Sequence, residues 1–386
     1  MHGTQPFNYG YPTPETTGIP TDSIEVVSGN LTERNDLKPF RLESIDIIRG
    51  LAIALMIFTH FFYYSINPAL IYNKLIFYVA DLASFFSVPL FYFTIGYTLS
   101  ISIKEKRRKG HSDSELTNYI LLRSCLIYFL GFVLNIDEVG FDRVWEWSTL
   151  QMISIGYIVT YFLLEKSKIT RAGLIVVSIM IACILAPFYS LYSYGGDWNF
   201  TAFIMGFIFS GDDPFFPWIA FFLLGSIIAE VKFTKKNIIL ICIPLLLLSS
   251  VSILAGGINS ITKYPASLTY IILFITGTLI TYYGLFYVYE IKNVGKVLFY
   301  PLRLFGMFPL TIFLFHIIVG EELIKRFSIY QSLGFIEFLG VFVVTMIMLT
   351  CVGFFWEKWE FKYSIDWFLK IVSHKMLKNK KITTER

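Results

Sequence analysis

The amino-acid sequence predicts an all-α fold, a polytopic bundle of membrane helices. Of its 386 residues, 55% are hydrophobic and 18% aromatic, and only 16% carry a charge. The mean hydropathy is +0.62, whereas soluble domains contain about one quarter charged residues. Long apolar runs occupy most of the chain. Together these observations predict one membrane domain built from helices, which satisfy their own backbone hydrogen bonds in lipid.

Three parts are expected along the chain. Residues 1–42 are rich in Pro and Gly and lack the basic start and apolar core of a signal peptide, which predicts a flexible cytoplasmic arm. Residues 43–357 contain the apolar runs and form the expected transmembrane domain. Residues 358–386 form a basic cytoplasmic tail.

Ten apolar runs of near 20 residues, bounded by charge, Gly or Pro, predict about ten transmembrane helices. They cover residues 44–66, 75–102, 117–135, 148–165, 172–191, 215–231, 237–255, 266–289, 304–325 and 332–355. The sixth run is short and begins around Pro214 and Pro217. Residues 202–209 are apolar but too short to span a membrane, so they predict a re-entrant piece or an interfacial helix.

The distribution of basic residues sets the expected orientation. With the amino terminus inside, the cytoplasmic segments carry 25 of the 32 Lys and Arg residues and the outer segments carry five. This bias predicts that both termini are cytoplasmic. The net charge of +4 therefore reflects topology, and no nucleic-acid-binding motif accompanies it. The four cysteines lie in apolar runs and show neither metal-ligand spacing nor a disulfide framework.

The run that starts at residue 44 is the most informative, because three ionisable side chains lie within it. A charged residue at the centre of a membrane helix costs roughly 2.5 to 3.5 kcal/mol, so such residues usually serve a function. Asp46 lies one turn before Arg49 and can pair with it. Arg49 and His60 share one helix face, roughly 16 Å apart along the axis. The alternative is a snorkelling Asp46–Arg49 pair, with His60 as an interfacial anchor.

The predicted topology places further polar side chains in two layers. The outer layer lies roughly 9–14 Å below the outer membrane boundary and contains His60, Asp81 and His316, with Gln151 nearer the surface. The second layer lies near the cytoplasmic ends of the spans and contains Arg49 and Arg123.

The two layers predict separate chemical roles. An imidazole beside a carboxylate is the usual construction of a general base, with His60 or His316 as the imidazole and Asp81 as the carboxylate. Buried arginines suit phosphate groups, which they bind bidentately. Gln151 is a candidate substrate-binding residue. Structural roles remain open for each residue: Asp81, His316 and Gln151 can be interhelical hydrogen-bond partners, and Arg123 can snorkel.

Several short motifs support a resemblance to a known family. The first block is Ser44-Ile45-Asp46-Ile47-Ile48-Arg49-Gly50-Leu51-Ala52, followed by His60. Later motifs are Val79-Ala80-Asp81-Leu82, Phe93-Thr94-Ile95-Gly96, Arg123-Ser124, Leu150-Gln151, Pro217-Trp218, Leu224-Gly225, Gly306-Met307 and Phe315-His316. Over roughly residues 41–320 the chain therefore resembles the transmembrane acyltransferases that include the catalytic domain of heparan-alpha-glucosaminide N-acetyltransferase and, more distantly, the bacterial membrane O-acetylases.

The resemblance implies acyl transfer from cytoplasmic acyl-CoA to an acceptor on the far side of the membrane. His60 falls on the catalytic histidine of the O-acetylase pattern, and Arg49, Arg123 and Asp46 fall on donor-site or supporting positions. The heparan enzymes differ, because they place asparagine at the position of His60 and their active histidine in the next loop, where this chain has Ile71. Their glucosamine substrate is therefore not carried over.

The expected function is that of an acyl-CoA-dependent O- or N-acyltransferase of the cell membrane, with acetyl-CoA or another acyl-CoA as co-substrate and no metal. Expected partners are membrane lipids and an extracytoplasmic glycan or lipid acceptor, and a homodimer is left open. The alternative is a secondary transporter or flippase with an intramembrane His/Asp/Arg site, although the 46–60 block has no second copy that would indicate inverted repeats. A catalytically silent scaffold would leave the cost of the buried charges unexplained.

The charge bias predicts opposite accessibility for two loops. Single cysteines placed at Lys106 and Asp197 should react with membrane-impermeant thiol reagents from opposite sides of sealed vesicles. Labelling of both positions from the outside would contradict the predicted topology and the two layers derived from it.

Overall fold

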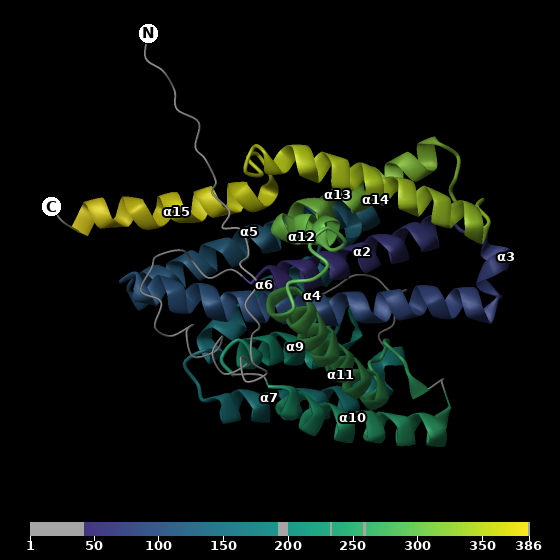
Figure 1. The fold of residues 1–386 in the computed structure, drawn as a ribbon, viewed down its shortest axis with the longest axis horizontal. Helices are drawn as coiled ribbons and strands as arrows, with labels where there is room; N and C mark the ends of the chain where they lie inside the picture. Colours follow the sequence, from purple (N-terminus) through teal and green to yellow (C-terminus); the bar gives the residue numbers. More distant parts are fainter. Residues whose placement is uncertain (1–41, 192–199, 232–233, 258–259, 385–386) are drawn as a thin grey trace, which may run out of the picture. The chain divides into compact units, whose positions relative to one another are not determined.

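The computed structural model describes residues 42–191, 200–231, 234–257 and 260–384. The regular elements in these ranges are helices, which confirms the predicted fold class (Figure 1). In chain order they are α2 (Glu43–Ser65), α3 (Pro68–Ile71), α4 (Lys74–Arg108), α5 (Asp113–Val139), α6 (Thr149–Leu163), α7 (Lys168–Leu185), α8 (Phe200–Met205), α9 (Phe215–Ile228), α10 (Lys235–Gly256), α11 (Leu268–Leu285), α12 (Tyr300–Met307), α13 (Pro309–Arg326), α14 (Phe335–Glu357) and α15 (Ile365–Thr384). The predicted arm, apart from its last residue, and the labelling position Asp197 lie outside the described residues.

The helix lengths bear on the predicted number of membrane spans. Seven helices are long and apolar enough to cross a membrane, and the bent pair α12–α13 would make an eighth. Each of the ten predicted spans coincides with a helix or with this pair. However, α6 and α9 contain only 15 and 14 residues, fewer than the roughly 20 that cross a bilayer core. The count of ten is therefore not confirmed, and the orientation of the termini also stays a prediction.

The break between α12 and α13 has a local cause. The two helices meet at an angle of 90°, and Phe308 between them has a non-helical backbone with φ −134° and ψ 57°. Pro309, which follows, has no backbone N–H to donate and disfavours a helical conformation at the residue before it. The predicted ninth span is therefore a broken helix.

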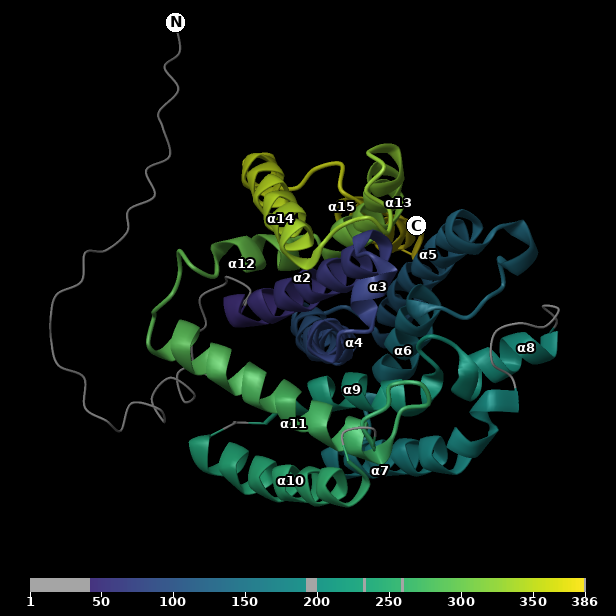
Figure 2. The ribbon, with the colours of Figure 1, turned by 90° about the vertical axis from the view of Figure 1, so that its right-hand side faces the viewer.

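Helices α2 and α4 lie at the centre of residues 42–384. In Figures 1 and 2 they run between α12, α13 and α14 on one side and α7, α9, α10 and α11 on the other. In the most apolar part of α2, 72% of residues are buried, whereas the value is 11% for α7 and for α14. The apolar faces of α7, α10 and α14 are thus available to lipid, as expected for a membrane bundle.

Two reciprocal pairs of glycines allow the closest helix contacts. A Cβ atom at Gly50 of α2 would lie 1.7 Å from the carbonyl oxygen of Leu302 in α12, and one at Gly306 of α12 would lie 1.8 Å from that of Asp46. Small residues permit such close backbone approach between membrane helices. Gly96 of α4 and Gly225 of α9 form the same arrangement, with distances of 1.9 and 2.0 Å to the opposite carbonyl oxygens.

Substitution of Gly50 should therefore destabilise the protein. Gly50→Ala forces α2 and α12 apart, and overpacking of this kind typically costs about 1–3 kcal/mol. Gly340→Ala in α14 is the matched control, because a Cβ atom there meets nothing within 4 Å and alanine favours the helix by about 0.5–1 kcal/mol. The fraction that remains monodisperse after heating in detergent measures both effects. Equal stability of the Gly50→Ala and Gly340→Ala variants would show that α2 and α12 are not in close contact at Gly50.

Candidate active site

Two of the predicted site histidines meet in the structure. His60 on α2 and His316 on α13 have ring centroids 5.1 Å apart, with the rings nearly perpendicular. The α2–α13 contact brings them together although 256 positions separate them in the sequence. The expectation that these residues belong to one layer is therefore consistent with the structure.

The surroundings of His316 define how its ring can act. Its Nδ1 atom lies 3.2 Å from the carbonyl oxygen of Ile312, so Nδ1 carries the hydrogen that it donates to this carbonyl. Its Nε2 atom is then an acceptor, and this atom is buried with no hydrogen-bond partner among the described residues. A buried imidazole with a vacant acceptor beside His60 is suited to bind or orient a polar group.

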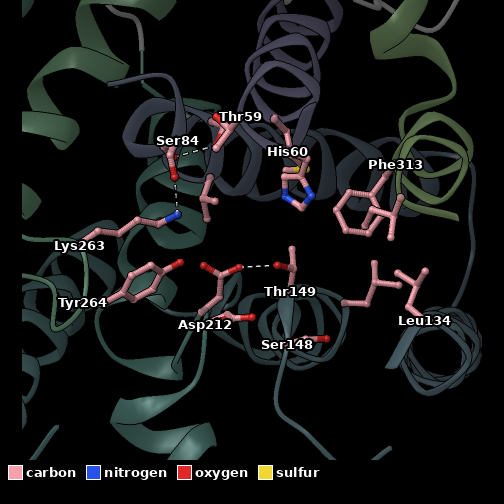
Figure 3. Close-up of a pocket in the computed structure, with 16 residues that line it drawn as sticks. Thr59, His60, Ser84, Leu134, Ser148, Thr149, Asp212, Lys263, Tyr264 and Phe313 are labelled. Carbon is pink, nitrogen blue, oxygen red and sulfur yellow. Dashed lines mark hydrogen bonds between the residues drawn. The ribbon is translucent and has the colours of Figure 1, made fainter. Parts of the chain in front are cut away.

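His60 also lines a pocket of about 130 Å³, drawn in Figure 3. Residues from α2, α4, α5, α6 and α13 and from the loops before α9 and α11 form its walls. In Figure 3, His60 and Thr149 lie on facing sides, and Ser84 and Lys263 are joined by a hydrogen bond. The polar residues lining it are Thr59, His60, Ser84, Ser87, Ser148, Thr149, Asp212, Asp213, Lys263 and Tyr264.

Asp213 is a buried residue of this pocket that three hydrogen bonds hold in place. It is 1% exposed. Its Oδ2 atom accepts hydrogen bonds from the hydroxyls of Tyr92 at 2.8 Å and Thr149 at 2.6 Å. The indole N–H of Trp147 donates to its backbone carbonyl at 2.8 Å. Tyr92 on α4, Thr149 at the start of α6 and Trp147 in the loop before α6 therefore hold Asp213 in place. Asp213 lies two residues before the start of α9.

Lys263 supplies a positive charge to the same pocket. Its ammonium group lies 3.3 Å from the hydroxyl of Ser84 and 5.0 Å from the ring centre of Tyr264. Burial lowers the pKa of Lys263, and the negative charges of Asp213 and Asp212 oppose this shift. The aspartates thus favour the charged form of a lysine that its burial would otherwise neutralise.

Glu146, in the loop before α6, directly precedes Trp147 and is buried. Burial raises the pKa of Glu146 to about 7, although Arg143, which donates a hydrogen bond to it at 2.8 Å, acts in the opposite direction. The Glu146 carbonyl in turn accepts a hydrogen bond from Asn135. This carboxyl therefore titrates near neutral pH, beside the loop that holds Trp147.

Of the predicted outer-layer residues, only His60 lines the pocket, whereas Asp81, Gln151 and His316 do not. Asp81 on α4 accepts a hydrogen bond from the hydroxyl of Tyr63 at 3.0 Å, and Tyr63 follows His60 by one turn of α2. Gln151 is fully buried. It packs against Gly131 of α5 and accepts a hydrogen bond from Ser148. Neither arrangement tests the predicted roles of Asp81 and Gln151. The amide nitrogen of Gln151 is buried and has no hydrogen-bond partner among the described residues.

Arg49, which belongs to the predicted cytoplasmic layer, contacts three helices. The guanidinium group of Arg49 donates to the carbonyl oxygen of Gly306 at 3.0 Å and to the hydroxyl of Thr98 at 3.2 Å. It lies 3.6 Å from the carboxylate of Asp46, the ion pair that the sequence predicts. Arg49 therefore joins α2, α4 and α12, a structural role that accompanies any role in donor binding.

Arg123 belongs to a cationic cluster that the sequence did not reveal. Its guanidinium group donates to the hydroxyl of Tyr119 at 3.3 Å and lies 5.9 Å from the ring centre of Tyr157. The ammonium group of Lys106 lies 4.1 Å from the ring centre of Tyr119. Tyr119 thus contacts two cations, Lys106 and Arg123, at the predicted cytoplasmic side.

Sequence reasoning missed Asp213 and Lys263 as site residues. Asp213 stands directly before the Pro214 that starts an apolar run, and a buried acid at that position was a usable signal. Lys263 is one of the five basic residues of the predicted outer segments, and nothing in the neighbouring sequence indicates its burial. Among the residues that the structure describes, no group of three or more His, Cys, Asp or Glu side chains is arranged to hold a metal ion.

Comparison with known proteins identifies the family. A search of curated proteins found no match. The family model described as heparan-alpha-glucosaminide N-acetyltransferase, catalytic, matches residues 41–264, more than half of the chain. The match covers α2 to α10 together with His60, Asp213 and Lys263, whereas His316 lies beyond it. The chain therefore belongs to the heparan-alpha-glucosaminide N-acetyltransferase catalytic family, a family of transmembrane acetyltransferases.

Proposed function

We propose that the protein transfers an acyl group, in the simplest case acetyl, from cytoplasmic acyl-CoA to a hydroxyl or amine of an extracytoplasmic glycan or lipid. The observation that carries the proposal is the position of His60, on a largely buried membrane helix and in a polar pocket. Acyl transfer to a weak nucleophile needs a base within hydrogen-bond reach. Membership of an acetyltransferase family supports an enzyme over the secondary transporter considered above.

In the proposed reaction, the acceptor oxygen or nitrogen attacks the thioester carbonyl carbon while His60 removes its proton. The C–S bond then breaks, and the imidazolium of His60 returns a proton to the leaving thiolate. His316 lies against His60 and is proposed to position it. Asp81 is proposed to act through Tyr63, which it binds one turn beyond His60. A two-step route through an acyl-His60 intermediate uses the same residues.

The proposed donor site is the cationic cluster of Lys106, Arg123 and Arg49. Phosphate groups of acyl-CoA would bind Arg123 and Lys106, whose contacts are with aromatic and hydroxyl groups. Arg49 already has the Asp46 carboxylate as a partner, so its contribution to phosphate binding is expected to be smaller. Asp46 is proposed to hold Arg49 in place.

Purified protein incubated with acetyl-CoA labelled in the acetyl group tests the function directly. Label should appear on an acceptor when an extract of cell-envelope glycans and lipids is added. Label bound to His60 in the absence of extract supports the two-step route, and its absence supports direct transfer. If label reaches no acceptor, and intact acetyl-CoA instead accumulates inside proteoliposomes, the transporter alternative is favoured.

Replacement of His60 should abolish transfer without preventing donor binding. Positioned general bases contribute about 10²–10⁴-fold to rate, so His60→Ala should lower kcat by that factor while acetyl-CoA affinity changes little. His111→Ala is the matched control, because His111 pairs with Glu115 outside the pocket, and it should retain full activity. A His60→Ala enzyme that stays active while His316→Ala is inactive would place the base on α13.

Loss of Arg123 should weaken donor binding. Removing a charge-assisted phosphate contact costs roughly 1.5–3 kcal/mol, or about 10- to 150-fold in the Kd for acetyl-CoA. Arg107→Ala is the control, because Arg107 forms ion pairs with Asp113 and Glu165 at the surface. Titration calorimetry on both folded variants measures the change. Unaltered affinity in Arg123→Ala would remove this residue from the donor site.

A further inference from the structure

The first turn of α13 receives hydrogen bonds from a distant part of the chain. Phe308, which precedes α13, makes no side-chain cap, and Pro309 has no backbone N–H. Asp366, in the first turn of α15, supplies the missing acceptor. Its Oδ2 atom accepts hydrogen bonds from the backbone N–H of Thr311 at 3.0 Å and from the Thr311 hydroxyl at 2.9 Å. The same hydroxyl accepts the backbone N–H of Ile365 at 3.0 Å. A carboxylate at this position binds an otherwise unpaired N–H and interacts favourably with the helix dipole.

The turn that Asp366 caps also holds the ring of His316. Nδ1 of His316 donates to the carbonyl oxygen of Ile312 at 3.2 Å, and Ile312 directly follows Thr311. The opposite side of the contact is the candidate base, because the rings of His316 and His60 lie 5.1 Å apart. A short series of contacts therefore connects Asp366 to His60 through one turn of α13.

The break between α12 and α13 makes contacts from other elements important for the direction of α13. In a continuous helix each turn fixes the direction of the next, but α12 and α13 meet at 90°. Helix α13 packs against α2 and α15, and α15 lies beside α13 and α5 in Figures 1 and 2. The contact with α15 acts on the first turn, where the direction of α13 is set.

The turn between α14 and α15 has an uncommon backbone. Glu360, Phe361 and Tyr363 have φ angles of 54°, 51° and 66°, a left-handed conformation that non-glycine residues keep only where surrounding contacts impose it. One such contact is the stacking of Phe361 on Phe308, with ring centroids 4.7 Å apart. The turn thus binds the break itself, and Asp366, which follows the turn, binds the helix after the break.

We propose that Asp366 is a positioning residue for the acyl transfer: by holding the first turn of α13, it sets the ring of His316 against His60. The start of α15 then belongs to the functional domain, beyond the predicted boundary at residue 357. The inference rests on the proposed function for its effect on turnover. The placement of His316 itself does not require turnover.

Two substitutions of Asp366 test its effect on turnover. Asp366→Ala removes both hydrogen bonds, whereas Asp366→Asn keeps an oxygen acceptor, and asparagine caps helices about as well as aspartate. We expect Asp366→Ala to lower kcat by about 10- to 100-fold, because a small misplacement near the reacting groups has an effect of this size. The KM for acetyl-CoA should stay unchanged, and Asp366→Asn should recover most of the loss. Activity is measured as transfer of labelled acetyl to the cell-envelope extract.

Glu337→Ala is the matched control. Glu337 accepts the backbone N–H of Gly334 at 2.7 Å at the start of α14, a helix that carries none of the predicted site residues. This variant also loses a carboxylate at a helix N-terminus and should keep the wild-type kcat. Wild-type kcat in folded Asp366→Ala protein overturns the proposal, and so does an equal fall of kcat in Glu337→Ala. If Asp366→Ala does not fold, Thr311→Val replaces it, with Thr311→Ser as the variant that restores the hydroxyl.

A double-mutant cycle tests whether the effect passes through His316. If Asp366 acts by placing this ring, the variant that combines Asp366→Ala with His316→Ala should be no slower than His316→Ala alone. Reductions of kcat that multiply in the double variant show independent roles and contradict the proposal.

The ring signals of the histidines test the placement without any turnover. The chain contains five histidines, so ¹⁵N labelling of histidine gives few NMR signals, and His60→Gln and His316→Gln assign two of them. Asp366→Ala should shift both signals, whereas Asp366→Asn and Glu337→Ala should leave them near their wild-type positions. Shifted signals in a protein that transfers no acyl group support the placement and argue against the proposed function. Unshifted signals together with acyl transfer by the wild-type protein support the proposed function and overturn the role of Asp366.

Discussion

The close contacts of α2 with α12 and of α4 with α9 are the constraint on which the rest of the structure depends. At both crossings a glycine on each helix touches the backbone of the other, so neither pair can shift without a clash or a void. At the first crossing, Arg49 of α2 donates a hydrogen bond to the carbonyl oxygen of Gly306 in α12. Because α2 carries His60, the position of this crossing also fixes the candidate base.

The second crossing has the same consequence for the pocket. Tyr92 lies one turn before Gly96 on α4, and Asp213 precedes the start of α9. Their hydrogen bond therefore joins two helices whose spacing is already fixed. Lys263, in the loop before α11, adds a positive charge to the wall of the pocket. The helices that carry the site are thus held in place by packing, and the hydrogen bonds to Asp213 add to this. Asp213 and His316 each keep one acceptor atom without a partner among the described residues.

The sequence predicted the helices, the Asp46–Arg49 pair and a common depth for His60 and His316, because these depend on hydropathy, on helical spacing and on the positions of residues along their spans. It predicted that the run containing α9 is short, but it did not predict the short α6, since an apolar run does not show where a helix ends. It also missed Asp213 and Lys263, whose burial depends on how two loops fold over the bundle. The partner of Asp81 proved to be Tyr63, a choice that rotation of α4 decides and that depth alone cannot.

The two polar layers on α2 bear on how one enzyme could act across a membrane. Arg49 and His60 are separated by eleven residues on a continuous helix, which corresponds to about 16 Å. Acyl-CoA carries its phosphates at one end of a long flexible arm and its thioester at the other. Under the proposed function, phosphates bound near Arg123 would leave the thioester free to reach His60. A fixed donor and a fixed base would then suffice, and the protein would not need the alternating access of a transporter.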